Sequence, residues 1–235
     1  MKTTSRYNAY EPDACGHIHY SADDDAVWHD LIIPQRARTD RYCSRIFRSG
    51  LDSLQLSDDR IPQCSEVSER LEAATGWRVT PVPALISFDR FYALLADRRF
   101  PAASFIRARD EMDYLQEPDI FHEIFGHTPL LANPQIAEFS HRIGQLGCRA
   151  RPEDHVWLAR LYWFTVEFGL IREDGRIRAL GAGLASSASE LPYAVDGDIA
   201  LRQPFDLLEV LRTPTASTST SRSILYSTAS NSCSN

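Results

Sequence analysis

Apolar side chains recur at helical spacing in several stretches of the chain, and polar capping residues precede these stretches. An acidic run at 23–25 begins the first stretch, whose apolar residues continue to Pro34, where we expect the helix to end. Ser65, Ser87 and Asn133 are predicted N-caps of three further helices, because each stands just before an apolar stripe. The pattern therefore predicts amphipathic helices spread along the chain.

Three other segments carry local signals of their own. A helix is predicted from about 153 to 168, where aromatic and aliphatic residues repeat on one side. The dipeptide Asp-Gly at 174–175 predicts a tight hairpin between 170–172 and 176–178. The apolar segment 77–86 contains two prolines, which exclude a helix and predict an extended loop that lines something.

Composition limits the class of protein. At 235 residues, with 43% hydrophobic and 24% charged residues, the chain fits one soluble domain with a sizeable core. A net charge of -7 without a basic stripe argues against nucleic acid or an anionic membrane as a partner. The five cysteines form no Cys-x-x-Cys pair, as in a reducing cytosol. No signal-peptide core and no apolar run near the roughly 18 residues of a membrane span are present, so we expect a cytoplasmic protein.

The two ends of the chain differ from its middle. Residues 1–22 are polar and are interpreted as an N-terminal arm. His17 and His19 could face one side of a strand, but exposed histidines in an opening arm are the favoured interpretation. Residues 215–235 consist mainly of Ser, Thr and Ala, a composition typical of disorder.

The most informative feature is a pair of imidazoles, His122 and His127, with the carboxylate of Glu123 beside the first. Neutral imidazole is the commonest side-chain metal ligand, so the pair suggests a metal site. The spacing is one residue longer than the His-Glu-x-x-His of zinc proteases. At about 100° per residue, positions five apart lie about 140° apart on an α-helix. Both side chains can reach one ion only if the helix ends or distorts, which Gly126 and Pro129 would allow.

Two imidazoles leave a metal site incomplete, and Glu167 is the best candidate for a third ligand. It is a lone acid among apolar and aromatic residues, where a carboxylate is costly to bury unless it is paired or bound to a metal. Two His and one carboxylate form the ligand set of non-haem Fe(II) oxygenases, and the same donors also serve catalytic zinc. Ligand identity alone therefore leaves the metal open.

Two rival interpretations follow from the same residues. A zinc hydrolase would use Glu123 as the general base that activates water, but the longer His spacing counts against it. A purely structural His pair, or an inactive remnant with an altered end, would bind no metal.

Three segments, 114–130, 158–170 and 181–187, resemble the pterin-dependent aromatic amino acid hydroxylases, especially their short bacterial members. The likeness covers residues 1–214 approximately. It implies a single, mostly helical α+β catalytic domain, 23–214, with a small β-sheet. It further implies an iron-dependent monooxygenase that converts L-phenylalanine to L-tyrosine with tetrahydrobiopterin, or another reduced pterin, and O2.

The same resemblance places this activity in phenylalanine catabolism and implies a monomer. Tyrosine or tryptophan as the substrate stays open. The short chain, which lacks a regulatory domain, favours phenylalanine.

The resemblance also assigns roles to residues. It makes His122, His127 and Glu167 the iron ligands. It places a pterin against backbone near Leu85 and the ring of Phe91, although from the pattern alone Phe91 is an ordinary core residue.

Further assignments concern Glu123 and the amino acid substrate. Glu123 is expected beside the pterin and in the outer shell of the metal. Arg107 and Ser186 would hold the substrate carboxylate, while Trp163 and Phe168 would shape the ring pocket. From the pattern alone, Arg107 is more readily a surface charge.

Three positions depart from the pattern of the family. Leu115 replaces a hydroxyl residue of animal members, and Leu180 and Ala185 replace the usual tyrosine and leucine.

The tail has a simple explanation at the level of codons. The codons ACC GCA TCG ACA TCT ACC AGC CGA would encode residues 215–222 as they stand. With one T restored in front, the same bases encode YRIDIYQP, and suitable codons for the remainder give a continuation close to VLDSLEQLF. Both strings resemble the apolar ending of the hydroxylases. We therefore interpret 215–235 as a frameshift product.

Overall fold

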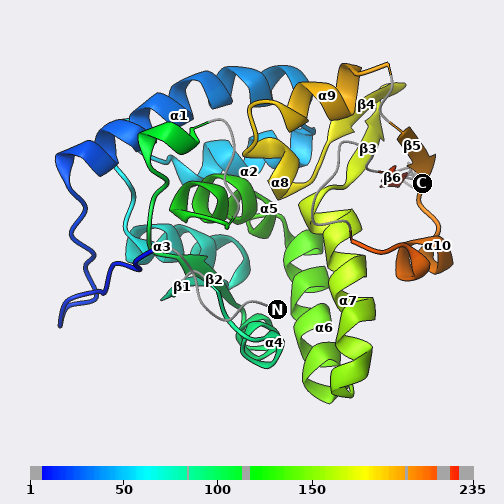
Figure 1. Ribbon diagram of the computed structural model, residues 1–235, viewed down its shortest axis with the longest axis horizontal. Helices are drawn as coiled ribbons and strands as arrows, with labels where there is room; N and C mark the ends of the chain where they lie inside the picture. The colour runs from blue at the N-terminus through cyan, green and yellow to red at the C-terminus, as the bar shows by residue number, and fades with distance from the viewer. Residues whose placement is uncertain (1–6, 84, 113–116, 199–200, 216–222, 228–235) are drawn as a thin grey trace.

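The computed structural model describes residues 7–83, 85–112, 117–198, 201–215 and 223–227 (Figure 1). Its α-helices are α1 (Ala22–Tyr42), α2 (Arg45–Leu54), α3 (Cys64–Thr75), α4 (Phe88–Ala96), α5 (Thr128–Leu131), α6 (Pro134–Arg149), α7 (His155–Tyr162), α8 (Ala182–Ala185), α9 (Glu190–Asp196) and α10 (Leu207–Arg212). Short 3-10 turns form η1 (Arg109–Glu111) and η3 (Pro152–Asp154), and π-helical turns form η2 (His122–His127) and η4 (Trp163–Glu167). The strands are β1 (Arg78–Val82), β2 (Arg99–Ala103), β3 (Leu170–Glu173), β4 (Arg176–Ala179), β5 (Leu201–Pro204) and β6 (Ser223–Ser227).

Helix α1 begins as the sequence predicts but continues past its proline. Ser21 caps the helix and shares a capping box with Asp24. The prediction that Pro34 ends this helix was wrong, because Pro34 lies on the exposed face while later turns of the helix are held in the core. Gln35 is buried there, and its amide nitrogen donates to the Ala185 carbonyl over 2.7 Å. This tertiary contact outweighs the helix-breaking tendency of a single proline.

The predicted caps are confirmed at two of three helices. Ser87 accepts from the backbone N–H of Arg90 at the start of α4, and the Asn133 side chain caps α6. At α3 the cap is Gln63 rather than Ser65, two residues earlier than predicted. The Glu66 carboxylate accepts from the Gln63 backbone N–H over 2.9 Å, which fixes the helix start at that point.

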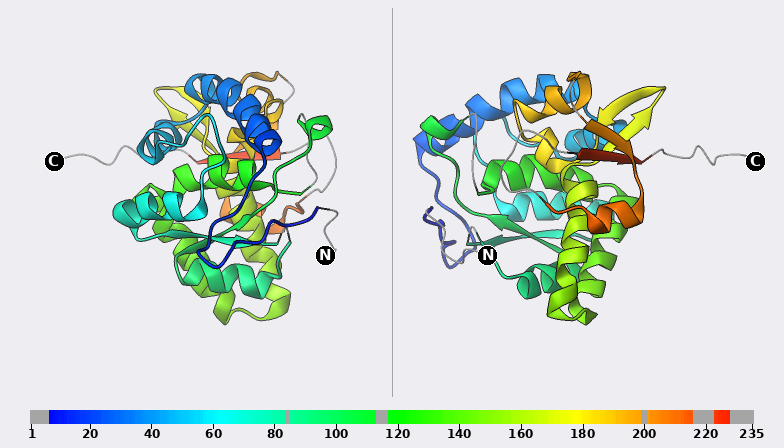
Figure 2. Two further views of the ribbon diagram at one scale, coloured as in Figure 1. Left: turned by 90° about the vertical axis from the view of Figure 1, so that its left-hand side faces the viewer. Right: turned by 45° about the vertical axis from the view of Figure 1, so that its right-hand side comes forward.

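The β-structure is divided into two small sheets rather than one. Strand β1 pairs in parallel with β2, so half of the proline-containing segment 77–86 that was predicted as a loop, residues 78–82, is a strand. The second sheet has the order β4-β3-β6-β5. The two sheets lie apart, with η2, α5 and α8 between them (Figures 1 and 2).

The predicted hairpin is confirmed. Strands β3 and β4 pair antiparallel around Asp174 and Gly175, whose φ angles are 49° and 76°. Both values lie in the left-handed region that this type of two-residue turn requires.

The tail differs in part from the expectation of disorder. Its residues 223–227 form β6, which pairs in parallel with β3 on one side and β5 on the other. The backbone groups of the two neighbouring strands give this segment hydrogen-bonding partners that its composition does not reveal. The remainder of the predicted tail after residue 215 lies outside the described residues.

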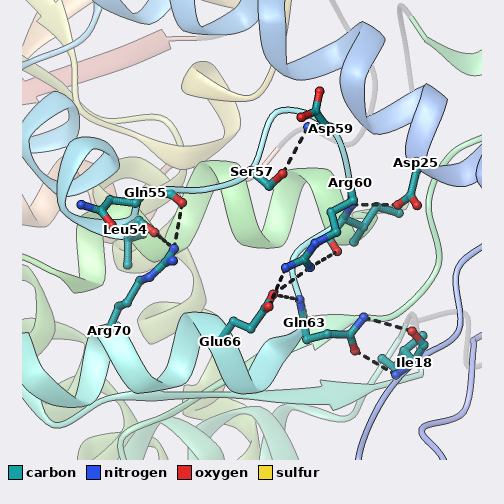
Figure 3. A network of polar contacts seen from close by, with 11 residues as sticks. Ile18, Asp25, Leu54, Gln55, Ser57, Asp59, Arg60, Gln63, Glu66 and Arg70 are labelled. Atoms are coloured by element: carbon teal, nitrogen blue, oxygen red, sulfur yellow. Dashed lines mark hydrogen bonds and ion pairs between the residues drawn. The ribbon is translucent and has the colours of Figure 1, made fainter.

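The N-terminal arm is fastened to the rest of the protein, as Figure 3 shows around Gln63. Ile18, only 2% exposed, donates its N–H to the Gln63 side-chain oxygen and accepts from the Gln63 side-chain nitrogen. Nearer the start, the ring of Tyr7 stacks on Phe105 with centroids 4.4 Å apart. The arm is therefore held against the domain, while His17 and His19 are exposed as predicted.

One large apolar cluster joins most of the helices, and α4 and α6 approach each other closely within it. A Cβ at Gly147 of α6 would lie 2.1 Å from the Cγ of Tyr92, a ring that is 1% exposed. The Tyr92 hydroxyl donates to the His155 carbonyl over 3.0 Å, which holds the ring in place. Glycine is thus required here for close helix packing.

We expect Gly147→Ala to lower the free energy of unfolding by about 1–3 kcal/mol, because the added methyl overpacks a rigid buried ring. Urea unfolding followed by circular dichroism measures the change. Gln145→Ala, on the exposed face of the same helix, is the control and should shift stability by less than about 0.5 kcal/mol. Equal stability of the two variants would contradict this account of the packing.

Candidate active site

The paired histidines lie on a π-helical turn, η2, which spans His122–His127. In a π-helix the hydrogen bonds run between residues five apart, so each turn is wider than an α-turn and positions i and i+5 come onto one side. The prediction that the helix must distort between the two histidines is therefore confirmed. Gly126 allows this turn to approach α8, since a Cβ there would lie 2.9 Å from the Ala182 carbonyl oxygen.

A second π-helical turn, η4, carries Glu167. The sequence predicts one continuous helix from about 153 to 168, whereas the structure divides it into η3, α7 and η4. The Thr165 hydroxyl donates to the Leu161 carbonyl over 2.6 Å at this change of winding. Such a side-chain bond to the preceding turn is a common companion of helix distortion.

The two turns bring three potential ligands together. His122 Nε2 and His127 Nε2 are 3.1 Å apart, and the Glu167 oxygens lie 3.5 Å from the first and 3.0 Å from the second. An ion bound at about 2.1 Å from each donor separates neighbouring donors by roughly 3 Å. The arrangement therefore fits a metal ion held by two imidazoles and one carboxylate, with its other positions open.

Electrostatics keeps the first imidazole in its metal-binding form. Burial lowers the pKa of His122 to about 4, against the opposing effect of the Glu167 carboxylate. The ring is consequently neutral at physiological pH, as a ligand must be.

Ser186 determines which nitrogen of His122 is available. The Ser186 hydroxyl donates to the Ala182 carbonyl over 2.9 Å, so its oxygen accepts from His122 Nδ1–H, which is 2.9 Å away. This leaves Nε2 of His122 as the free donor for a metal. The resemblance implied that Ser186 binds the substrate carboxylate, and the structure adds this contact with a metal-binding histidine. At His127 the Nδ1 atom is buried without a hydrogen-bond partner among the described residues.

Arg107 is buried, with 7% exposure, so its interpretation as a surface charge was wrong. Its Nε and Nη2 donate to the two oxygens of Asp119 over 2.8 and 2.9 Å, and its backbone N–H donates to the same carboxylate over 3.0 Å. The His122 backbone N–H also donates to Asp119, over 3.0 Å. One carboxylate thus fixes both the arginine and the first metal-binding residue.

Asp119 was missed in the sequence analysis. It is fully buried, and burial alone would raise the pKa of its carboxyl. The Arg107 charge and the hydrogen bonds outweigh burial and hold that pKa below its usual value. The available signal was the same one that identified Glu167: an acid next to a run of apolar residues, here Ile120 and Phe121.

Glu123 is buried close to the metal-binding nitrogens. One of its carboxyl oxygens and the imidazole nitrogens of His122 and His127 lie within 4.8 Å of one another. Burial, followed by the charges of Glu167 and Asp119, raises the pKa of Glu123 well above its ordinary value. A neutral carboxyl at this position can donate a hydrogen bond as well as accept one.

Four other predicted site residues are half-buried or buried. Trp163 and Phe168 lie side by side with ring centroids 4.6 Å apart, at the two ends of η4. Phe91 is half-buried and meets Tyr162 edge-on at 5.7 Å, and Leu85 is half-buried in the segment before α4. Leu115, which replaces a hydroxyl residue of animal members, lies outside the described residues.

Comparison with known proteins now identifies the family. The model of the family described as biopterin-dependent aromatic amino acid hydroxylase matches residues 3–232. The chain belongs to this family. The predictions of the family and of a mostly helical catalytic domain with little β-structure are confirmed for this hydroxylase.

Individual relatives agree with this assignment. The hydroxylase is 49% identical over 213 residues to a protein of Vibrio cholerae named phenylalanine-4-hydroxylase, covering 91% of this chain and 74% of the relative. The apo structure of a cold-active phenylalanine hydroxylase from Colwellia psychrerythraea matches with a TM-score of 0.89 and 45% identity, covering 94% of this chain and 84% of that one. A Chromobacterium violaceum phenylalanine hydroxylase structure has bound iron(III) and 7,8-dihydrobiopterin; it matches with a TM-score of 0.87 and 39% identity over 93% of this chain and 79% of that one.

The helices in the described part of the hydroxylase do not include one with the length and apolar character needed to span a bilayer.

We expect Asp119→Asn to destabilise this hydroxylase by about 3–5 kcal/mol, because it leaves the buried Arg107 charge without its counter-charge. The dependence of the unfolding free energy on acid pH should also change. A carboxyl whose folded-state pKa is lowered contributes stability above its unfolded pKa, near 4, and that contribution disappears as the pH falls further. Urea unfolding between pH 3 and 7 measures both effects.

The matched control is the double variant Arg107→Met with Asp119→Leu, which removes both charges and keeps similar volumes. It should be more stable than Asp119→Asn alone. Two results would contradict the assigned ion pair. One is an equal loss of unfolding free energy in the two variants. The other is an Asp119→Asn variant whose stability depends on acid pH as in the parent chain.

Proposed function

We propose that this hydroxylase converts L-phenylalanine to L-tyrosine with Fe(II), tetrahydrobiopterin or another reduced pterin, and O2. The observation that carries the proposal is the convergence of His122, His127 and Glu167 from two π-helical turns. The names of the relatives from Vibrio and Colwellia support phenylalanine as the substrate. The iron and dihydrobiopterin bound by the Chromobacterium protein support the two cofactors.

Each residue of the proposed metal site has its own role. His122, His127 and Glu167 hold the iron through three positions and leave the others open. When bound, iron and the reduced pterin together supply the electrons and the site at which dioxygen is activated. Ser186 keeps His122 in the tautomer that presents Nε2, through the hydrogen bonds described above.

In this proposal, Arg107 binds the carboxylate of the amino acid. The edge of its guanidinium formed by Nε and Nη2 is occupied by Asp119, which fixes the plane of the group. The edge formed by the outer N–H groups of Nη1 and Nη2 is the one that can form a two-point bond with a substrate carboxylate. Loss of this contact should raise KM for the amino acid more than it lowers kcat.

The proposal assigns different residues to the amino acid and to the pterin. Trp163 and Phe168 provide adjacent rings against which a phenyl ring can pack. For the pterin, Phe91 provides a ring for stacking, and Leu85 provides backbone groups near it. The buried carboxyl of Glu123 supplies a hydrogen-bonding group for the pterin.

The decisive experiment is anaerobic reconstitution with Fe(II), followed by product identification with each aromatic amino acid. Tyrosine from phenylalanine should form with a higher kcat/KM than any product from tyrosine or tryptophan. Glu167→Ala should lose bound iron and at least about 99% of turnover, since removal of a ligand opens the metal centre. Glu153→Ala, an exposed acid on η3, is the control and should retain both.

Two results would contradict the proposal. If Glu167→Ala kept its iron content and its turnover, the assignment of Glu167 as an iron ligand would be contradicted. Activity restored by zinc, with ester or amide cleavage and no tyrosine formed, would instead favour the hydrolase interpretation.

We also propose that the hydroxylase acts as a monomer in the cytoplasm. In the described residues Cys43 and Cys64 are buried free thiols, and burial raises the pKa of Cys64 to about 12. Such protonated thiols suit a reducing compartment. Sedimentation of the reconstituted protein should give a mass near 26.6 kDa, and twice that mass would contradict a monomer.

The tail is proposed to result from the loss of one base. The change to a Ser/Thr-rich composition at residue 215 and the apolar strings of the restored reading frame support this. Resequencing the genomic DNA near codon 215 tests it directly, because an intact reading frame at that site would contradict a lost base.

A chain with the restored ending should be more stable by several kcal/mol, since each apolar Å² that it buries contributes about 25 cal/mol. Thermal and urea unfolding of the two chains measures the difference. A chain with the present tail residues in shuffled order is the matched control and should gain nothing.

A further inference from the structure

Residues 181–186 contact both segments that carry the proposed metal ligands. At the end of α8, Ser186 accepts a hydrogen bond from His122 of η2. At its beginning, Gly183 lies against Glu167 of η4. This one-turn helix therefore sits between the two halves of the site.

The contact at Gly183 involves the acid group itself. A Cβ built on Gly183 would lie 2.5 Å from Glu167 Oε1 and 3.1 Å from Glu167 Cδ. Separations under about 3.0 Å do not occur for real Cβ atoms, so any side chain at this position has to displace the carboxylate. The displaced atom is the one that lies 3.5 Å from His122 Nε2.

We propose that Gly183 is a positioning residue for Glu167: the absence of its side chain leaves the space in which the carboxylate takes its metal-facing position. The inference rests on the proposed metal site, and it adds a residue that touches no metal, substrate or pterin in that proposal. It also explains why a glycine occupies an ordinary helical position, where no positive φ requires one.

Neighbouring glycines make the distinction between positioning and packing testable. A Cβ at Gly181 would lie 2.3 Å from the Glu167 backbone oxygen, so a substitution there forces two backbone segments apart. At Gly183 the nearest backbone atom, the same Glu167 oxygen, is 3.1 Å away, and the close contact is with the end of a side chain. A side-chain end moves at small cost, whereas backbone does not.

The two substitutions to alanine should therefore act on different properties. In Gly183→Ala the apo-protein keeps its fold, and the carboxylate moves away from the point where the three donors meet. In Gly181→Ala the packing of α8 on η4 is lost, and the apo-protein is destabilised.

The experiment measures metal binding and stability on the full chain without turnover. Anaerobic titration of the apo-protein with Fe(II), and with Co(II) as a spectroscopic probe, gives the dissociation constants. We expect Gly183→Ala to weaken binding of both ions by about 10- to 100-fold, the usual effect of disturbing a residue that orients a ligand. Its urea midpoint without metal should stay close to that of the parent chain, while that of Gly181→Ala falls clearly.

A double-mutant cycle assigns the effect to Glu167. In the Glu167→Ala background, Gly183→Ala should cause no further loss of Co(II) affinity, because the group that it displaces is absent. A Glu167→Asp background provides a second test, since the shorter acid leaves room for the added methyl and the penalty of Gly183→Ala should shrink.

Three outcomes would overturn the inference. The first is a folded Gly183→Ala variant with unchanged metal affinity. The second is a loss of Co(II) affinity on Gly183→Ala that is equal with and without Glu167. The third is a Gly183→Ala apo-protein that is destabilised as much as Gly181→Ala. Failure of the proposed function gives a different pattern, because the parent chain would then bind Co(II) through Glu167 but form no tyrosine.

Discussion

The buried ion pair between Asp119 and Arg107 is the interaction on which the architecture of the site depends. A carboxylate with no exposed surface is costly to hold in a protein interior unless its charge and its lone pairs are matched. Asp119 meets this requirement with three bonds to Arg107 and one to the backbone of His122. The segment that follows β2 is thereby tied to the start of η2. The two carboxylate oxygens of Asp119 therefore fix both Arg107 and the backbone of His122.

The rest of the metal-binding arrangement is built outward from that point. Ile120 donates its N–H to the Phe105 carbonyl, which continues the connection between the two segments. From η2, the contacts of Gly126 and Ser186 with α8 lead to Gly183 and so to Glu167. The steps as far as α8 are backbone approaches or short hydrogen bonds, and the last is the close contact of Gly183 with the Glu167 carboxylate. Donor atoms from segments about 40 residues apart in the chain can therefore meet within 3.0 to 3.5 Å.

Local chemistry made parts of this structure predictable. Ser87 and Asn133 cap their helices, and the Asp-Gly turn forms its hairpin, because these signals act within a few residues. The distortion between the histidines followed from helix geometry alone. The hydrogen bond between Ser186 and His122 could not be predicted in the same way, because it joins residues 64 positions apart.

The predictions that were wrong failed because of tertiary contacts. Pro34 is tolerated in α1 because Gln35 is held by Ala185, 150 positions away in the chain, and residues 78–82 become a strand because β2 lies beside them. Neither partner is visible in the local pattern. The division of the helix at 153–168 into α7 and η4 likewise depends on the need to turn Glu167 toward the histidines, a constraint that periodicity does not record.

The wide turn η2 has a consequence for how such sites relate to one another. An α-turn closes its hydrogen bond at the fourth residue and a π-turn at the fifth, so the two differ by a single amino acid. Deleting one residue between His122 and His127 would recreate the shorter His-Glu-x-x-His register on a regular helix. Along this part of the backbone, the spacing of an oxygen-activating centre and that of a hydrolytic centre thus differ by one residue. What keeps them distinct is whether the surrounding domain accommodates the extra residue as a bulge.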